Sequence, residues 1–177
     1  AVAGYTAASK ADQLSVLVNN AMMTAISNYV AQNFGAGKKD RIRLGVRASL
    51  IQTEAFNILM CIGILLLRHP IVELFLSNPT AEIYHYSDAF LTIEAPFYFL
   101  LGLLAVYRTS IQSMQNGRAP FAACMIELVM RLAATVWLSR FLGYTAVCIA
   151  SPLAWFGAVA LLIPVYYRMM IKPVKTV

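Results

Sequence analysis

Long runs of apolar residues, separated by short polar connections, dominate the pattern of this chain. A helix needs about 20 mainly apolar residues to cross the hydrocarbon core of a membrane. Four runs meet that length cleanly, and a fifth, nearest the N-terminus, is more polar. The predicted spans cover residues 10–35, 46–67, 83–115, 119–140 and 146–168. The polar-apolar alternation of a membrane β-barrel is absent, so the pattern predicts an all-α polytopic transmembrane helix bundle.

The composition agrees with a lipid environment. Hydrophobic residues make up 60% of the chain and charged residues only 12%. Soluble domains are about 45–50% apolar and about 25% charged. A water-soluble chain of this length would have too much surface to cover with so few charges.

The basic residues sit in clusters that flank the apolar runs. One cluster lies in residues 38–47, and another follows the last span with Arg168, Lys172 and Lys175. The positive-inside rule places both on the cytoplasmic side, which makes the C-terminus cytoplasmic and the N-terminal end external. This placement, rather than the net charge of +6, argues against nucleic acid as a partner. We expect an integral protein of the cell membrane, specifically a bacterial inner membrane.

The chain carries no motif of enzyme chemistry. Cys61, Cys124 and Cys148 lie inside or at the ends of spans, and His69 and His85 fall in one polar connection, so neither a disulfide nor a metal site is expected. HExxH, GxSxG and phosphate-binding loop motifs are absent from the sequence. We therefore expect no enzyme activity and no cofactor beyond a coupling ion.

The first span carries polar side chains at every fourth position. Asn20, Thr24, Asn28 and Gln32 form a slowly drifting row on one helix face. Such a row can hydrogen-bond to a neighbouring membrane helix, or it can line a water-filled cavity. The sequence leaves both interpretations open.

The second and third spans each contain an acidic residue. Glu54 and Asn57 lie in the second span, where Glu54 can pair with Arg47 near the interface or take part in an ion pathway. Glu94 lies two residues before Pro96 and is expected at the interface. Pro96 itself should kink the third span.

Arg108, Glu127 and Arg131 form the most informative group. Arg108 precedes Gly117 by nine residues, and Glu127 follows Arg118 by nine, so a tight hairpin brings them to the same depth. Arg131 is one turn beyond Glu127. A lone charge within a membrane costs at least about 2.5–3.5 kcal/mol, so we expect the three to pair. The network can be structural, or it can serve a substrate, proton or gating function.

Several segments, taken in order, resemble the multidrug and toxic compound extrusion (MATE) family. The similarity lies in Ala3–Lys10, in Thr24–Gly37 with its Gln32-Asn33-x-Gly35-Ala36-Gly37-Lys38 sequence, in Glu127-x-x-x-Arg131, in Leu142–Tyr144 and in Pro152–Trp155. It covers essentially the whole chain, as helices eight to twelve of twelve.

The resemblance implies two six-helix lobes around a central cavity, with the N-terminal lobe absent here. It implies antiport of bulky, amphipathic, often cationic compounds against H⁺ or Na⁺, in contact with membrane lipid and with the missing lobe. One branch of the family uses an Asp that falls near Ala105, where no carboxylate lies within a turn. The resemblance therefore implies the DinF-like branch, with coupling residues in the missing lobe.

Three alternatives remain. A flippase for lipid-linked precursors in the same superfamily should carry more cations in its spans than Arg108 and Arg131. An intramembrane enzyme would need a catalytic cluster that the spans lack. A purely structural membrane subunit predicts that Glu127→Gln and Arg131→Ala change folding yield but not transport.

Overall fold

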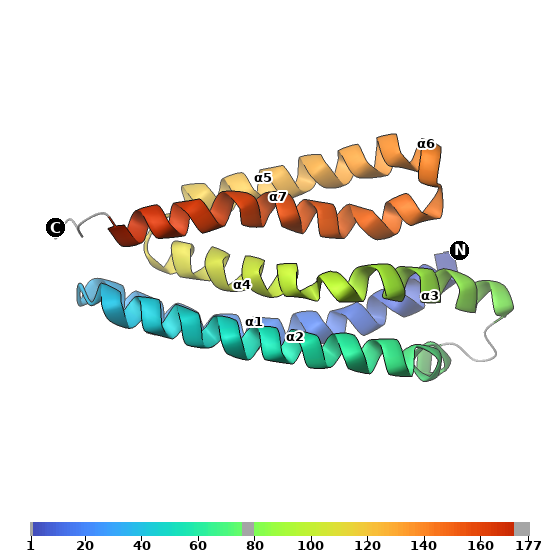
Figure 1. Ribbon diagram of the computed structural model, residues 1–177, viewed down its shortest axis with the longest axis horizontal. Helices are drawn as coiled ribbons and strands as arrows, with labels where there is room; N and C mark the ends of the chain where they lie inside the picture. The colour runs from blue at the N-terminus through green and yellow to red at the C-terminus, as the bar shows by residue number, and fades with distance from the viewer. Residues whose placement is uncertain (1, 76–79, 172–177) are drawn as a thin grey trace.

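The computed structural model describes residues 2–75 and 80–171, and every regular element within those ranges is helical. The long helices run back and forth along one axis (Figure 1). The elements are α1 (Val2–Gly35), α2 (Lys39–Phe75), α3 (Ala81–Glu94), η1 (Ala95–Phe97), α4 (Tyr98–Ser113), α5 (Arg118–Ala133), η2 (Ala134–Leu138), α6 (Ser139–Leu142) and α7 (Tyr144–Ile171). The predicted all-α bundle is confirmed.

Four of these segments are long and apolar enough to cross a membrane. They are Lys39–Leu74, Ala81–Ser113, Arg118–Leu142 and Tyr144–Ile171. The more polar α1 has 34 residues, which corresponds to about 50 Å of helix. Large apolar side chains are exposed along α2 and α5, among them Leu59, Leu66, Phe121 and Leu132. Apolar surfaces of this kind suit contact with lipid tails.

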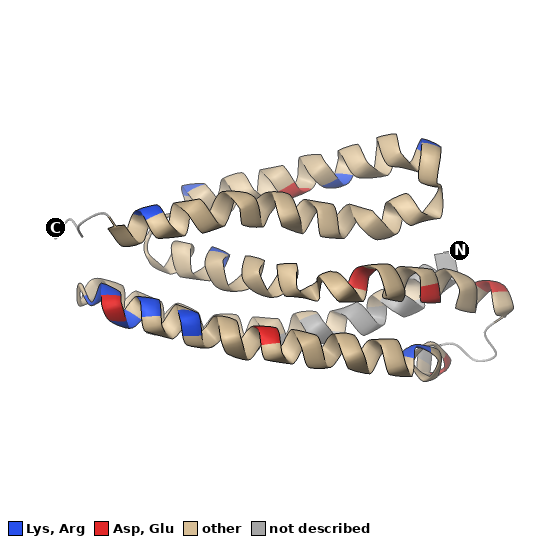
Figure 2. Cartoon of the chain, in the orientation of Figure 1, with Lys and Arg blue, Asp and Glu red and all other residues tan. Residues whose placement is uncertain are grey.

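One end of the bundle carries most of the described basic side chains. This end, called the basic end below, holds the α1–α2 turn, the α4–α5 turn and the C-terminal end of α7 (Figures 1 and 2). Its cations are Lys38, Lys39, Arg41, Arg43, Arg47, Arg118 and Arg168. Lys172 and Lys175 lie outside the described residues. The predicted grouping is present, while the cytoplasmic assignment of this end stays a prediction.

Helix α4 lies at the centre of the bundle. It packs against α1, α2 and α7, and it buries Leu104, Val106 and Ile111 almost completely. The α5 helix packs mainly on α7 (Figure 1). This contact is close because Gly157 of α7 has no side chain, and a Cβ there would lie 2.0 Å from the sulfur of Met130.

Two prolines shape the long helices in different ways. At Pro96 the α-helix gives way to the short 3-10 turn η1 between α3 and α4, which confirms the predicted distortion. Pro70 lies within α2, which continues to Phe75; its last turns bend away and are seen end-on in Figure 1. His69 lies in α2 and His85 in α3, so both histidines of the connection between the second and third spans are in helices.

Candidate functional site

An ion pair links α4 to α5. A terminal nitrogen of the Arg108 guanidinium donates to Oε1 of Glu127. The two side chains are 25% and 18% exposed, so each charge lies largely out of contact with solvent and is neutralised by the other. The hairpin that aligns them turns at Gln115, whose φ of 62° is in the left-handed region. The predicted pairing of Arg108 with Glu127 is confirmed.

Arg131 does not join this pair. Its side chain is exposed, and the described part of the chain holds no ion pair between it and Glu127. A step of four residues leaves a rotation of about 40° around the helix, which moves Arg131 off the face that meets α4. The prediction of a three-membered cluster was therefore wrong. The role of Arg131 stays a prediction.

A second polar group lies where α1, α2 and α4 meet. Asn57 of α2 is 1% exposed. Its Nδ2 donates to the carbonyl oxygen of Tyr98 at 3.1 Å, and its Oδ1 accepts a hydrogen bond from Nδ2 of Asn19 at 3.3 Å. One amide thus ties three helices together, and the hydrogen bonds offset the cost of burying it.

Glu54 lies one turn before Asn57, against the backbone of α4. Gly102 makes this approach possible, because a Cβ at that position would lie 2.3 Å from Asn57 Nδ2 and 2.6 Å from Glu54 Oε1. That oxygen is buried and has no hydrogen-bond partner among the described residues. The alternative of an ion pair with Arg47 is not seen among them either. We call Asn19, Glu54, Asn57 and Gly102 the three-helix cluster.

The carboxylate of Glu54 has no cation that compensates its charge among the described residues. A buried charge is costly unless it is paired and hydrogen-bonded, yet the buried Oε1 of Glu54 has no hydrogen-bond partner among the described residues. A carboxylate in such surroundings can hold a proton or a small cation, and Asn57 can help to orient it. This sets it apart from Glu127, whose charge is already compensated by Arg108.

The polar row on α1 faces away from the packed helices. Asn20, Thr24, Asn28 and Gln32 are all exposed, and the hydroxyl of Thr24 donates to the carbonyl of Asn20 on the same helix. The described helices therefore cover none of these four side chains. We call them the α1 polar row.

The buried face of α1 carries residues that the sequence reasoning did not select. Asn19, Ile26, Val30 and Asn33 are buried, and they recur with helical spacing. Asn19 was missed because its neighbour Asn20 fitted the regular row of polar residues. The apolar Ile26 and Val30, seven and eleven positions later, were the signal that could have identified Asn19 as an interface residue.

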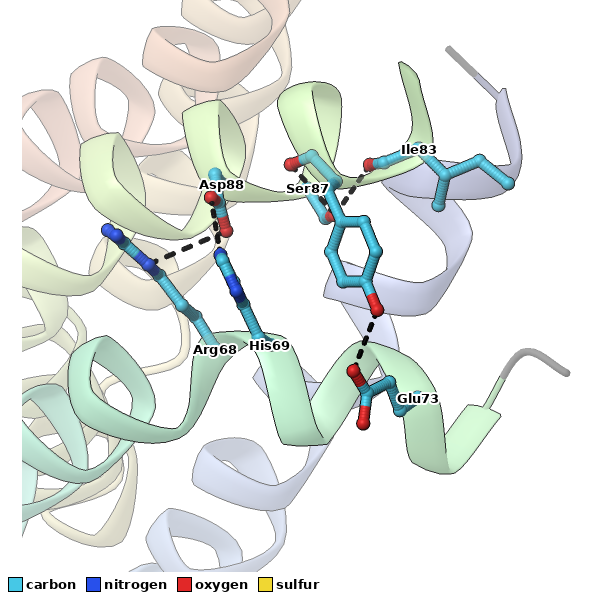
Figure 3. A network of polar contacts seen from close by, with 7 residues as sticks. Arg68, His69, Glu73, Ile83, Ser87 and Asp88 are labelled. Atoms are coloured by element: carbon cyan, nitrogen blue, oxygen red, sulfur yellow. Dashed lines mark hydrogen bonds and ion pairs between the residues drawn. The ribbon is translucent and has the colours of Figure 1, made fainter. Parts of the chain in front are cut away.

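A further polar network, also missed, joins α2 to α3 (Figure 3), and it lies at the end of the bundle opposite the basic end (Figure 1). Asp88 meets His69 Nε2 at 2.9 Å and Arg68 Nε at 3.7 Å. The hydroxyl of Tyr84 donates to Glu73 at 2.8 Å. These contacts connect the last turns of α2 to α3, and they depend on how the two helices pack, which the local sequence pattern does not specify.

Glu94 is 2% exposed, so its predicted interfacial position was wrong. The α3 helix packs against α1, α2 and α7, and its buried residues Phe90, Leu91 and Glu94 lie in its C-terminal half.

Comparisons with known proteins extend this picture. The family model described as MatE matches residues 1–137. A protein of Shewanella oneidensis named FAD transporter is 21% identical over 154 residues, which cover 86% of this chain and 34% of that protein. The chain thus spans about a third of the length of this curated relative, and no solved structure matches it. Given the apolar helices and a family match over most of its length, this integral membrane protein belongs to the MatE family.

Proposed function

We propose that the chain forms most of the C-terminal lobe of a secondary transporter in a bacterial inner membrane. This transporter would export amphipathic, often cationic organic compounds in exchange for H⁺ or Na⁺. The observation that carries the proposal is the α1 polar row, which lies exposed on an otherwise apolar bundle. Polar groups facing lipid are costly, so we infer that the row borders a water-filled path.

The residues divide into three roles under this proposal. Asn20, Thr24, Asn28 and Gln32 line the path that a substrate follows between this lobe and an N-terminal lobe. Glu54, oriented by Asn57, holds the coupling ion. Membership of the MatE family supports the transporter class, and sites between two lobes near the membrane midplane are typical of secondary transporters.

The charged residues near α5 have a mechanical role in the same proposal. Arg108 and Glu127 hold α4 and α5 together in one state and separate as the two lobes rock against each other. Arg131, exposed one turn away from Glu127, is positioned to replace Arg108 as a partner in the other state. Mutually exclusive pairs of this kind give two discrete arrangements, as a switch requires.

The DinF-like branch remains our proposal for the type of coupling. No carboxylate of α4 lies within a turn of Ala105. Glu54 reaches α4 from a different helix, at Gly102, three residues before Ala105. A carboxylate supplied by α2 is therefore the candidate ion-holding group of this lobe, alongside any in the other lobe.

Export of a flavin nucleotide is a second candidate, favoured by the similarity to the Shewanella protein named FAD transporter. A flippase for lipid diphosphates is less favoured because Arg108, one of the two cations within the spans, is neutralised by Glu127. A purely structural subunit predicts that Glu127→Gln and Arg131→Ala change the folding yield but not transport.

The test is transport by the full-length protein in proteoliposomes. Ethidium or FAD would be loaded, and a pH gradient or a Na⁺ gradient imposed separately. Ethidium movement that depends on one gradient supports the proposal. Movement of FAD alone would replace it with the second candidate, and no movement of either compound, by protein that is folded and correctly inserted, would contradict both.

A further inference from the structure

A pocket of about 470 Å³ opens at the basic end between α2, α4 and α7. Neither α1 nor α5 contributes to its lining, so it is separate from the α1 polar row and from the Arg108–Glu127 pair. Tyr167 and Ile171 on its lining are 55% and 78% exposed. The pocket therefore opens toward the outside of the bundle.

One wall of the pocket is cationic. Arg43 and Arg47 lie one turn apart on α2, and no Asp or Glu is among the lining residues. Arg43 donates to the carbonyl oxygen of Met170 at 3.3 Å, and it is 4.0 Å from the exposed Asp40. Arg47 has no hydrogen bond or ion pair among the described residues. Its guanidinium, with five donors, is thus available to a ligand.

The position of this wall is held by the last turn of α7. The final carbonyls of a helix have no partner within the helix. Lys39 Nζ donates to the carbonyl of Met169 at 2.8 Å, and Arg43 donates to that of Met170. These bonds hold the ends of α2 and α7 side by side, so the pocket between them has fixed walls.

The opposite wall is aromatic and apolar. Tyr107 of α4 and Tyr166 of α7 meet edge to face, with ring centroids 5.2 Å apart. Val46 and Leu50 add apolar side chains from α2 to the lining. Tyrosine is favoured at the membrane interface, where its ring is in an apolar layer and its hydroxyl is wet.

The two walls lie at the depths that a phospholipid requires. Arg47 is eight residues into α2, about 12 Å from its start. The apolar run of the second span begins immediately after it, and the next cation on α2 is Arg68. The arginines are therefore at the level of the headgroups, and Leu50 is at the level where the acyl chains begin.

We propose that this pocket binds the phosphodiester headgroup of an acidic phospholipid. Arg47 and Arg43 contact the phosphate, and the glycerol and first methylenes lie against Leu50 and the tyrosines. Basic pockets between membrane helices suit such headgroups, and guanidinium groups match phosphate oxygens in geometry. A lipid is favoured over free phosphate because the apolar wall would have no role with the free anion.

Native mass spectrometry of the full-length protein in a neutral detergent tests the proposal without any transport measurement. Dioleoyl phosphatidylglycerol and dioleoyl phosphatidylcholine are titrated separately. We expect tighter binding of phosphatidylglycerol to the wild type and about fivefold weaker binding to Arg47→Gln. Arg118→Gln is the matched control, because Arg118 is an exposed cation at the basic end outside the pocket.

An equal loss of phosphatidylglycerol affinity in Arg47→Gln and Arg118→Gln would overturn the proposal. It would show that the lipid is attracted to the basic surface as a whole. Competition by millimolar inorganic phosphate in the wild type but not in Arg47→Gln would overturn the choice of a lipid. If Arg47→Gln does not purify as a monodisperse protein, Arg47→Lys keeps the charge without the forked geometry. An intermediate affinity of that variant supports the proposal, and wild-type affinity overturns the assigned arginine contact.

Discussion

The bundle contains two polar groups between its helices that differ in charge compensation. Arg108 and Glu127 are 19 residues apart along the chain, and each neutralises the other. In the three-helix cluster, Asn57 bonds to Asn19 and to the carbonyl of Tyr98, which are 38 and 41 positions away along the chain. The cluster also includes Glu54, which has an oxygen without a hydrogen-bond partner among the described residues. Under our proposal, the compensated pair supports the fold and the uncompensated carboxylate holds the coupling ion.

The largest expected effect comes from removing one charge of the pair. Arg108→Met leaves Glu127 in the apolar layer without its partner, and we expect the free energy of unfolding to fall by about 3 kcal/mol. The double variant Arg108→Met/Glu127→Gln should recover part of this loss, because no lone charge remains. Unfolding of the full-length protein in mixed micelles measures both values.

Arg131→Met is the control for that experiment, since Arg131 is exposed and lies outside the pair. Its effect should stay within about 0.5 kcal/mol. If Arg108→Met were no more destabilising than this control, the pair could not be a support of the fold.

The next effect concerns the approach of α2 to α4. Gly102→Ala places a methyl group where Glu54 Oε1 and Asn57 Nδ2 now lie, and overpacking of this kind costs about 1–3 kcal/mol. Gly63→Ala in α2 is the matched control, because a Cβ there meets nothing within 4 Å. The same unfolding assay applies, and equal effects of the two substitutions would show that the close contact at Gly102 is absent in the membrane.

Glu54→Gln tests the difference between the Arg108–Glu127 pair and the three-helix cluster. The substitution keeps the shape and removes the charge that no cation neutralises, so the free energy of unfolding should stay within about 1 kcal/mol of wild type. Transport in proteoliposomes should lose its response to the imposed ion gradient. Asp40→Asn, a substitution of a fully exposed acid on the same helix, should retain that response. If transport by Glu54→Gln still responded to the ion gradient as the wild type does, Glu54 would not be part of the ion pathway.

The smallest effect on stability is expected for the α1 polar row. Asn20, Thr24 and Asn28 are exposed, so each change to Ala should alter stability by no more than about 0.5 kcal/mol. Efflux should nevertheless decrease, because the path loses its polar lining. Efflux equal to that of the wild type in the triple variant would show that the row does not line the pathway.

The Arg108–Glu127 pair and the three-helix cluster also show which contacts can be predicted from the sequence. The pairing of Arg108 with Glu127 could be predicted because a tight antiparallel hairpin converts equal sequence distances into equal depth. The contact of Asn19 with Asn57 could not, because it depends on which face of α1 meets α2. A rotation of about 100° between neighbouring residues separates the buried Asn19 from the exposed Asn20.

By itself, the sequence determined that this is an all-α membrane protein, which apolar segments form its helices and which ends of them are basic. These properties follow from the length and hydrophobicity of each segment, and lipid acts on each segment separately. Only the tertiary structure decided that Glu54 lies against Gly102, that Glu94 is buried and that Arg131 stands apart. Those outcomes depend on helix rotation and close packing between distant segments, which local sequence patterns do not specify.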